Sequence, residues 1–382
     1  MTPRRCAADP GRRDRGRRAG TATRAGRALR LVPALLSVCA AAVLLSACSS
    51  AGSSTGATTP GTRGGAAASG GVDPAAPGTT QPATPAPPPL AAPSALAPFS
   101  SPAASGDGVW RGAGRAVGGR PAVYETTLVP PGGTQPAGIA WMDTRLLSAR
   151  LYSGSISPGG GPYPYTAPVQ PAQATSLVAA FNGGFQMKTA GGGYFTTGHA
   201  IDPLVTGAAS LVITADGSVD VGAWGSDVTM APGVVSVRQN LAPLVAGGQP
   251  TALAASADWQ AWGNTCGTTS CAPTVPGVEH QWRSGVGVTT GGALVYAAGP
   301  TLDPLQLAQL LVRAGVVRGM QMDINPDWTV LATYDPATTS GPATPANGSK
   351  LLPSTVQGPA TFFDPAWARD FVTMSARSGS GS

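Results

Sequence analysis

Four segments place polar residues at the ends of apolar runs or in glycine-rich turns, where side chains can act on a ligand. In the first, residues 179–186, an apolar run ends in Asn182-Gly183-Gly184. Two glycines let the backbone come close to a ligand, and an Asn side chain both donates and accepts hydrogen bonds. This corner is therefore predicted to bind substrate, with an ordinary Asn-Gly turn as the alternative.

The second segment, residues 191–199, is a glycine-rich loop that leads to a polar cluster and ends in His199. Because imidazole titrates near neutral pH, His199 is a candidate general acid, and a surface histidine without a function is the alternative. A serine nucleophile is not indicated, since no Gly-x-Ser-x-Gly elbow stands between a strand and a helix.

The third segment contains Arg283, which precedes the apolar run 285–289. A guanidinium at the mouth of a strand can hold a phosphate or carboxylate through two parallel hydrogen bonds. Lys and Arg are sparse after residue 47, so the position of each one is informative. Arg283 is predicted to bind an anionic substrate group, and a solvated Arg or one paired with a structural carboxylate is the alternative.

The fourth segment is the apolar run 319–322, which ends in Asp323 and is followed by the turn Asn325-Pro326 and by Asp327. A carboxylate at the end of a buried strand is partly desolvated, so its pKa can be tuned for proton transfer or nucleophilic attack. Asp323 is the predicted catalytic carboxylate, with a turn-capping Asp as the alternative.

The elements that must position these segments are mostly short strands. Strands are predicted at residues 122–128, 138–143, 177–181, 211–214, 219–223, 234–237, 285–289, 294–297, 319–323 and 329–334. Residues 215–218 and 290–292 are predicted hairpin turns. One helix is predicted, with Asp303 as N-cap, Pro304 at its first position and Gly315 at its end. The fold class is therefore α+β, a sheet-rich single domain with few helices.

Composition supports this class. Gly and Pro, at 53 and 38 residues, make up about a quarter of the 382, and charged residues are 11%. Such a chain is unlike a helical bundle. The formal charge of +6 comes entirely from residues 1–47, which hold ten Arg and two Asp. The rest of the chain lacks the net basic charge of a nucleic-acid-binding body, so no nucleic-acid partner is predicted.

The N-terminus has the order of a bacterial lipoprotein signal. Arg-rich residues 4–30 precede the apolar run 31–47, which ends in Leu45-Ser46-Ala47-Cys48. Cys48 would be acylated and would hold the protein at the extracytoplasmic face of the cell membrane through its lipid anchor. An ordinary secretory signal or an uncleaved anchor helix is the alternative.

Four regions follow from these patterns. Residues 1–47 are the predicted signal peptide, 48–105 a disordered Ser/Gly/Thr/Ala/Pro tether, 106–375 the folded domain and 376–382 a flexible tail. Within the domain, Cys266 and Cys271 are separated by four residues in a loop. In an oxidising compartment they are predicted to form a disulfide, with a metal clip as the alternative.

Taken in order, the segments resemble the phosphodiester glycosidase family, which includes the enzyme that removes N-acetylglucosamine from its phosphodiester on mannose 6-phosphate glycans. The matching stretches are residues 181–185, 240–245, 283–287, 290–292, the helix 302–314, 319–323 and 367–371. The resemblance implies a hydrolase of sugar-1-phosphodiester linkages in envelope glycans. Arg283 would hold the phosphodiester, and Asp323 would act at the anomeric carbon. Asn182 and Asn325 would orient the substrate, and His199 or Asp327 would supply the second catalytic group.

The sequence departs from the family at one strand end. The family usually carries Asp-Gly-Gly-Gly-Ser there, whereas this chain has Asp323-Ile324-Asn325-Pro326-Asp327. Pro326 removes a backbone amide that could contact a phosphate. A catalytically inactive, glycan-binding lipoprotein of the same fold therefore stays open as a second hypothesis. No cofactor is predicted; no ligand spacing demands a divalent metal, and its presence is left open.

Overall fold

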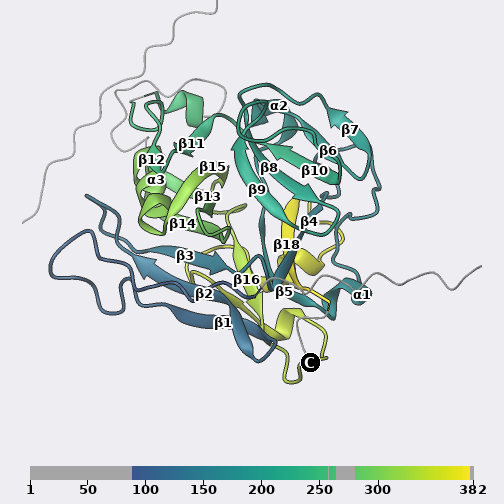
Figure 1. Cartoon of the computed structure of the whole chain (residues 1–382), viewed down its shortest axis with the longest axis horizontal. Helices are drawn as coiled ribbons and strands as arrows, with labels where there is room; N and C mark the ends of the chain where they lie inside the picture. Colours follow the sequence, from purple (N-terminus) through teal and green to yellow (C-terminus); the bar gives the residue numbers. More distant parts are fainter. Residues whose placement is uncertain (1–87, 257, 264–279, 379–382) are drawn as a thin grey trace, which may run out of the picture. The chain divides into compact units, whose positions relative to one another are not determined.

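The structure is a computed structural model that describes residues 88–256, 258–263 and 280–378 (Figure 1). The chain divides into two compact units, residues 1–79 and 80–382, and every described residue belongs to the second. Cys48, Cys266 and Cys271, and with them the predicted lipidation and disulfide, lie outside the described residues. The described part contains no helix long and apolar enough to span a membrane.

The largest sheet has eight strands, and its centre holds two of the four predicted site segments. Its order is β1-β2-β3-β14-β13-β15-β11-β12, and the pairings are antiparallel. The strands are β1 (Arg111–Val117), β2 (Arg120–Leu128), β3 (Ala137–Met142), β11 (Pro243–Ala246), β12 (Gln249–Pro250), β13 (Gln281–Thr289), β14 (Leu294–Leu302) and β15 (Val316–Ile324). Arg283 lies on β13 and Asp323 near the end of β15.

Two five-stranded antiparallel sheets accompany it. The first has the order β7-β6-β10-β8-β9 and the second β17-β16-β5-β18-β4. Their strands are β4 (Leu147–Tyr152), β5 (Leu177–Asn182), β6 (Tyr194–Thr196), β7 (His199–Asp202), β8 (Ala209–Thr214), β9 (Val219–Ala223), β10 (Val234–Gln239), β16 (Leu331–Tyr334), β17 (Gly348–Lys350) and β18 (Phe371–Ala376). The predicted corner at Asn182 lies at the end of β5.

The main core lies where the three sheets meet. Met142, Tyr296 and Met322 of the large sheet belong to the same buried cluster as Phe181 of β5 and Leu211 of β8. A second cluster lies on the other side of the large sheet, where helix α3 (Pro304–Arg313) packs through Leu307, Leu310 and Leu311. Each of these buried leucines contributes about 1.5–3 kcal/mol. The strands at the site are therefore held from both sides.

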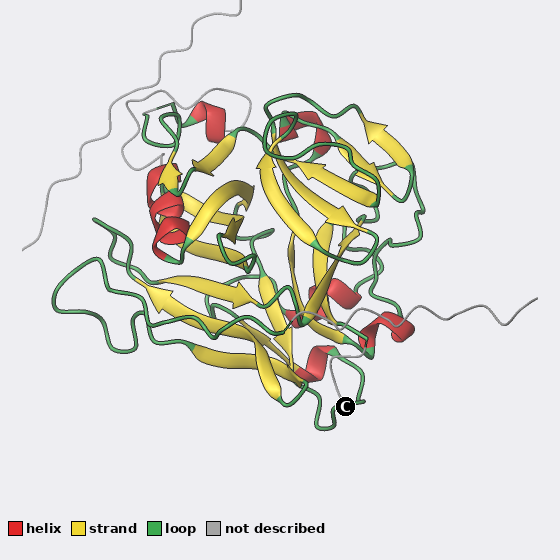
Figure 2. Cartoon of the chain, in the orientation of Figure 1, coloured by secondary structure: helices red, strands yellow, loops and turns green. Residues whose placement is uncertain are grey.

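Helix α3 begins and ends as the sequence predicts. The Asp303 carboxylate accepts the Gln306 amide at 2.7 Å, and the Gln306 side chain accepts the Asp303 amide at 3.0 Å. Pro304 occupies the first turn, and Gly315 follows the helix with a φ of 88°. Figure 2 shows α3 as the longest helix beside the much shorter α1 (Pro171–Ala174) and α2 (Met187–Ala190).

The sheet-rich fold class is confirmed, and each predicted strand is present, several with longer ends (Figure 2). The hairpin between β8 and β9 and the one between β13 and β14 are also as predicted. Eight strands of the described residues were not predicted: β1, β6, β7, β11, β12 and β17, together with β4 and β18. The last two form one edge of a sheet and its neighbour. Their sequences mix small polar and apolar residues and therefore lack the clear apolar run that marked the other strands.

The packed chain begins before residue 106, where the domain was expected to start. Leu90, Leu96 and Phe99 pack against the α3 cluster. The Leu90 amide donates to the Asp143 carboxylate at 2.8 Å, and the Leu96 amide donates to the Gly108 carbonyl at 2.9 Å. Residues 88–105, assigned to the tether from their composition, therefore include a strap that lies against the domain.

Candidate active site

The first and fourth predicted segments meet at the ends of β5 and β15. The Asp323 amide donates to the Gly183 carbonyl at 3.1 Å. The Asn182 side-chain amide donates to the Ser284 hydroxyl at 3.0 Å, and that hydroxyl donates to the Asp323 carbonyl at 2.7 Å. Antiparallel pairing with intervening strands thus brings together residues that are far apart in the sequence.

The Asp323 carboxylate pairs with the guanidinium of Arg369, and its other oxygen accepts the Ile324 amide at 2.9 Å. Asp323 is 5% exposed. Burial raises the pKa of Asp323 to about 7; Arg369 opposes this shift, and the charge of Asp370 adds to it. A carboxyl with such a pKa can both take up and release a proton near neutral pH, as acid–base catalysis requires.

Arg369 was not among the predicted site residues, although residues 367–371 formed part of the family resemblance. Its guanidinium lies 5.0 Å from the centre of the Trp328 ring and donates to the Gly184 carbonyl at 3.0 Å. Arg369 is 6% exposed, and its buried Nε has no hydrogen-bond partner in the described part of the protein. An oxygen of a bound anion would satisfy this donor.

A second buried ion pair lies next to the first, because Asp370 follows Arg369 in the chain and pairs with Arg238. Arg238 donates to both oxygens of the Asp370 carboxylate, at 2.8 Å and 3.2 Å, and both side chains are fully buried. Arg238 also donates to the carbonyls of Phe185 and Gln239. Burial alone would lower the pKa of Arg238, but Asp370 more than offsets this effect and the pKa is raised. The pair ties β10 to the loop before β18.

The buried pair of Arg238 and Asp370 explains why positions 183 and 184 hold glycine. A Cβ at Gly183 would overlap the Asp370 carboxylate, and one at Gly184 would lie 3.0 Å from the Arg238 guanidinium carbon. The Gly183 amide donates to the Asp370 carbonyl at 2.8 Å. The close approach that the sequence suggested is therefore made to the protein's own buried charges, and the two glycines shape the site without facing a ligand.

Asn182 has its full hydrogen-bonding capacity satisfied within the protein. Its amide group donates to the Gly183 carbonyl and the Ser284 hydroxyl, at 2.9 Å and 3.0 Å. Its oxygen accepts the Tyr296 hydroxyl at 2.7 Å and the Val330 amide at 3.1 Å. Both amide hydrogens and both lone pairs of the side chain are thus used, and Asn182 is only 1% exposed. Its side chain links β5 to β13, β14 and the residue before β16, and it has no hydrogen-bonding group left for a substrate.

Arg283 faces away from this cluster. Its guanidinium donates to the Leu302 carbonyl at 2.8 Å, to the Gln321 side chain at 2.8 Å and to the Trp262 carbonyl at 3.3 Å. Neighbouring residues of a strand point to opposite faces, and here Ser284 takes the face of Asn182. Arg283 is fully buried, which lowers its pKa to about 10. Arg283 is therefore held by groups of the protein itself, and Arg369 is the guanidinium that pairs with Asp323.

The remaining predicted residues are dispersed. His199 is exposed on β7, the edge strand of a different sheet, with its ring centre 5.6 Å from that of Tyr163. Asp327 is exposed in the turn after β15, where its amide donates to the Asn325 side chain at 2.8 Å. Asn325 has a φ of 100°, a left-handed conformation that favours glycine, so this turn carries local strain.

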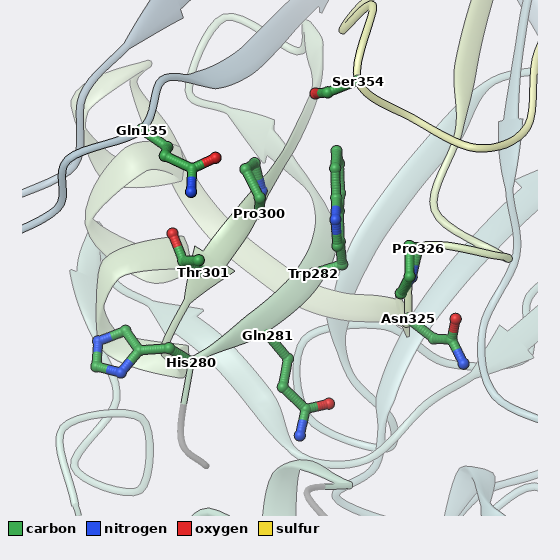
Figure 3. A pocket seen from close by; sticks show the side chains of 9 residues that line it. All are labelled: Gln135, His280, Gln281, Trp282, Pro300, Thr301, Asn325, Pro326 and Ser354. Atoms are coloured by element: carbon green, nitrogen blue, oxygen red, sulfur yellow. The ribbon is translucent and has the colours of Figure 1, made fainter. Parts of the chain in front are cut away.

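A pocket of about 630 Å³ opens beside the turn that follows Asp323 (Figure 3). Its lining mixes polar and apolar side chains and carries no carboxylate. It consists of Gln135, His280, Gln281, Trp282, Pro300, Thr301, Asn325, Pro326 and Ser354. Of the predicted site residues, Asn325 alone contributes to it. Thr301, with a φ of 50°, is a second residue in the left-handed region. An aromatic ring surrounded by amides and hydroxyls suits a neutral polyhydroxylated ligand such as a sugar.

Within residues 88–256, 258–263 and 280–378, no three His, Cys, Asp or Glu side chains gather as metal ligands would. The donors around Asp323 are mainly guanidinium groups and backbone amides, which bind anions.

No family model matches this chain, and no curated protein matches it. Among solved structures, the zebrafish N-acetylglucosamine-1-phosphodiester alpha-N-acetylglucosaminidase catalytic domain, auto-inhibited by its pro-peptide, is similar at 16% identity and a TM-score of 0.40, over 70% of this chain and 88% of that one. A hypothetical protein from Synechocystis gives 10% identity and 0.35, over 68% and 63%. A putative exported protein from Burkholderia pseudomallei gives 12% and 0.26, over 63% and 74%. At these TM-scores the likeness assigns neither fold nor activity to this chain.

Proposed function

We propose that this protein is a hydrolase that cleaves the glycosidic bond of sugar-1-phosphodiesters, with Asp323 as its general base. The observation that carries the proposal is the buried pair of Asp323 and Arg369. It combines a carboxyl whose pKa is about 7 with a guanidinium whose Nε has no partner in the described residues. A proton acceptor thus lies next to a group that can bind an anionic oxygen.

The reaction would proceed by attack of water on the anomeric carbon. Asp323 takes a proton from the water as the new carbon–oxygen bond forms, and the bond between the anomeric carbon and the phosphate oxygen breaks. The phosphate monoester leaves with the bonding electron pair, and Asp323 later releases its proton to solvent. The leaving group is already a stable anion, so no separate general acid is needed. Arg369 would stabilise the charge that develops on the phosphate.

The pocket beside Asn325 supplies the second part of the proposal. It begins two residues beyond Asp323, and Trp282 and the surrounding amides could hold one sugar of the substrate. The Asn325 amide donates to the Trp282 carbonyl at 3.1 Å, which fixes the turn against the pocket wall. The resemblance of the ordered motifs to phosphodiester glycosidases supports this substrate class.

The place of action is also part of the proposal. If Cys48 is acylated, the domain works at the extracytoplasmic face of the cell membrane on envelope glycans, at the end of the tether. Globomycin, which blocks lipoprotein signal cleavage, should then cause the precursor to accumulate in cells. Labelling of cells with radioactive palmitate should mark the wild-type protein and not the Cys48→Ser variant, whereas equal labelling of the two would contradict the lipid anchor.

The activity can be tested with the purified full chain. UDP-N-acetylglucosamine and a nitrophenyl sugar phosphodiester should be hydrolysed, and a plain nitrophenyl glycoside should not. Asp323→Asn should lower kcat at least a hundredfold, in line with the usual contribution of a general base. Asp258→Asn is the matched control, because Asp258 is exposed and, among the described residues, its carboxylate accepts the Ala261 amide. Equal loss in both variants, or no turnover by the wild type, would exclude the proposed hydrolase.

A second candidate is a glycan-binding protein without turnover. The pocket with Trp282 favours it, since the lining suits a sugar and Asp323 is not part of that lining. In that case Trp282→Ala should abolish binding of envelope glycan fragments in calorimetry, while no product appears with any phosphodiester. Turnover that depends on Asp323 would exclude this alternative.

A further inference from the structure

A second cavity, of about 890 Å³, is lined by none of the charged residues of the Asp323 cluster. Its walls come from β4, α1, β10, the tip of the β8–β9 hairpin and the last residues of β18. The hairpin is fastened to β4 because the Ala149 amide donates to the Gly217 carbonyl at 2.8 Å. A Cβ at Gly217 would overlap the Ser148 side chain, so the close contact depends on glycine. The cavity is therefore bounded by connected elements.

The charged residues of the lining are predominantly basic. Arg145, Arg150 and Arg377 line the cavity, against the single carboxylate of Asp216. This excess of basic residues contrasts with the chain after residue 47, which holds slightly more Asp and Glu than Lys and Arg. Asp216 is itself engaged, since it accepts the Thr214 and Ser218 hydroxyls at 2.6 Å and 2.7 Å. A surface of this kind attracts anions.

Arg150 is the best placed of the three to receive a ligand. Its guanidinium lies 4.7 Å from the centre of the Tyr165 ring, and it makes no hydrogen bond or ion pair with any described residue. By contrast, Arg145 donates to the Pro88 carbonyl at 2.9 Å, and Arg377 donates to the Thr144 carbonyl at 3.0 Å. Contact with the Tyr165 ring orients the Arg150 guanidinium group and leaves its N–H donors available for a ligand.

Two buried polar atoms in the wall also lack partners. The Gln173 side-chain oxygen and the Thr197 hydroxyl form no hydrogen bond within the described residues, although neither reaches solvent. Both residues line the cavity, and Thr197 has a left-handed φ of 46°. An unsatisfied buried polar group is unfavourable, and a ligand with hydroxyl groups would supply the missing hydrogen-bond partner. Further hydroxyls of the lining come from Thr144, Ser148, Ser176, Thr214, Ser218, Ser236 and Ser375.

We propose that this cavity binds an anionic carbohydrate. The Arg150 guanidinium would take the carboxylate or phosphate, and the hydroxyl and amide side chains would take the sugar hydroxyls. Apolar groups of Leu151, Ile213 and Val235 alternate with the polar ones and suit the C–H faces of a sugar ring. The volume lies within the range of small-molecule sites. The proposal is independent of Asp323 and of any hydrolysis there.

Calorimetric titration of the full chain tests the site. The probes are glucuronate and glucose 6-phosphate, which carry the two anionic groups, with glucose and inorganic phosphate as the neutral and sugar-free comparisons. At least one anionic sugar should bind, and Arg150→Gln should weaken its binding about tenfold or more, since the variant loses a charge-assisted hydrogen bond. Arg120→Gln is the matched control, because Arg120 is exposed at the start of β2 and lies outside the cavity.

A second variant separates binding from folding. Thr197→Val keeps the shape of the side chain and removes a hydroxyl that is unpartnered in the free protein, so the thermal midpoint should not fall while affinity does. The proposal is overturned if neither anionic sugar binds at millimolar concentration, or if Arg150→Gln and Arg120→Gln weaken binding equally. It is also overturned if glucose binds as tightly as glucuronate, or if inorganic phosphate binds as tightly as glucose 6-phosphate.

Discussion

Arg369 and Asp323, which stand 46 positions apart in the chain, form a buried ion pair at the end of β15. The residue that follows Arg369 is Asp370, whose carboxylate pairs with Arg238. Arg369 and Asp370, which are adjacent in the chain, therefore pair with two buried residues of opposite charge, Asp323 on β15 and Arg238 on β10. The arrangement fixes the corner at Gly183 and Gly184 and brings a guanidinium to the one carboxylate at the site whose pKa is raised to about 7.

The inner pair of Arg238 and Asp370 should be critical for stability. Asp370→Ala leaves the Arg238 charge buried and unpaired, and we expect a loss of about 3–5 kcal/mol in the free energy of unfolding. The double variant Arg238→Met/Asp370→Leu removes both charges and should lose less than the single variant. Urea denaturation measures both, and a single variant as stable as the wild type would contradict the role of the pair.

The glycine corner gives a steric prediction. Gly183→Ala places a methyl group on the Asp370 carboxylate, and the backbone must move to accept it. We expect a fall of at least about 2 kcal/mol in stability, within the range of overpacked sites. Gly291→Ala is the control, since the nearest atom to its Cβ would be the Thr289 hydroxyl at 3.8 Å. Thermal unfolding should show a large shift for the first variant and a small one for the second.

The raised pKa of Asp323 predicts how stability depends on pH. Its pKa is about 7 in the folded protein and about 3.9 when unfolded. Between these values the folded state binds more protons, so its stability falls as pH rises, by up to about 1.4 kcal/mol per pH unit. The contribution is complete below about pH 4 and is lost as pH rises through about 7.

Denaturation at several pH values should therefore show a smaller slope for Asp323→Asn than for the wild type. Burial also raises the pKa of Glu125 to about 7, so a second slope of the same sign should persist and should be reduced by Glu125→Gln. An Asp323→Asn variant with the wild-type slope would show that Asp323 is ionised throughout this range.

Much of the fold could be predicted because its signals are local. The hairpin at residues 215–218 and the capped helix α3 depend on a few neighbouring residues, and both are present. Strands β4 and β18 could not be found, because their side chains are small or mixed and their burial depends on neighbouring strands.

The site could be predicted only in part. Asn182 and Asp323 could be recognised as site residues because each is a polar residue at the end of an apolar strand. The side of β13 on which Arg283 lies could not be read from the sequence, because neighbouring strand residues alternate and the register shifts next to Arg283. The shift comes before Arg283 in the pairing with β14 and after it in the pairing with β15. Arg238 and Arg369 find their partners 132 and 46 residues away, so no local pattern marked them.

The most direct test of the account is the pH dependence of kcat/KM for a sugar phosphodiester. If Asp323 is the general base, kcat/KM should rise with pH, with an apparent pKa near that of the buried carboxyl, about 7, and reach a plateau above it. Asp323→Asn should remove both the activity and this transition. An Asp323→Asn variant that keeps the wild-type rate and the same profile would contradict the proposed role of the carboxylate.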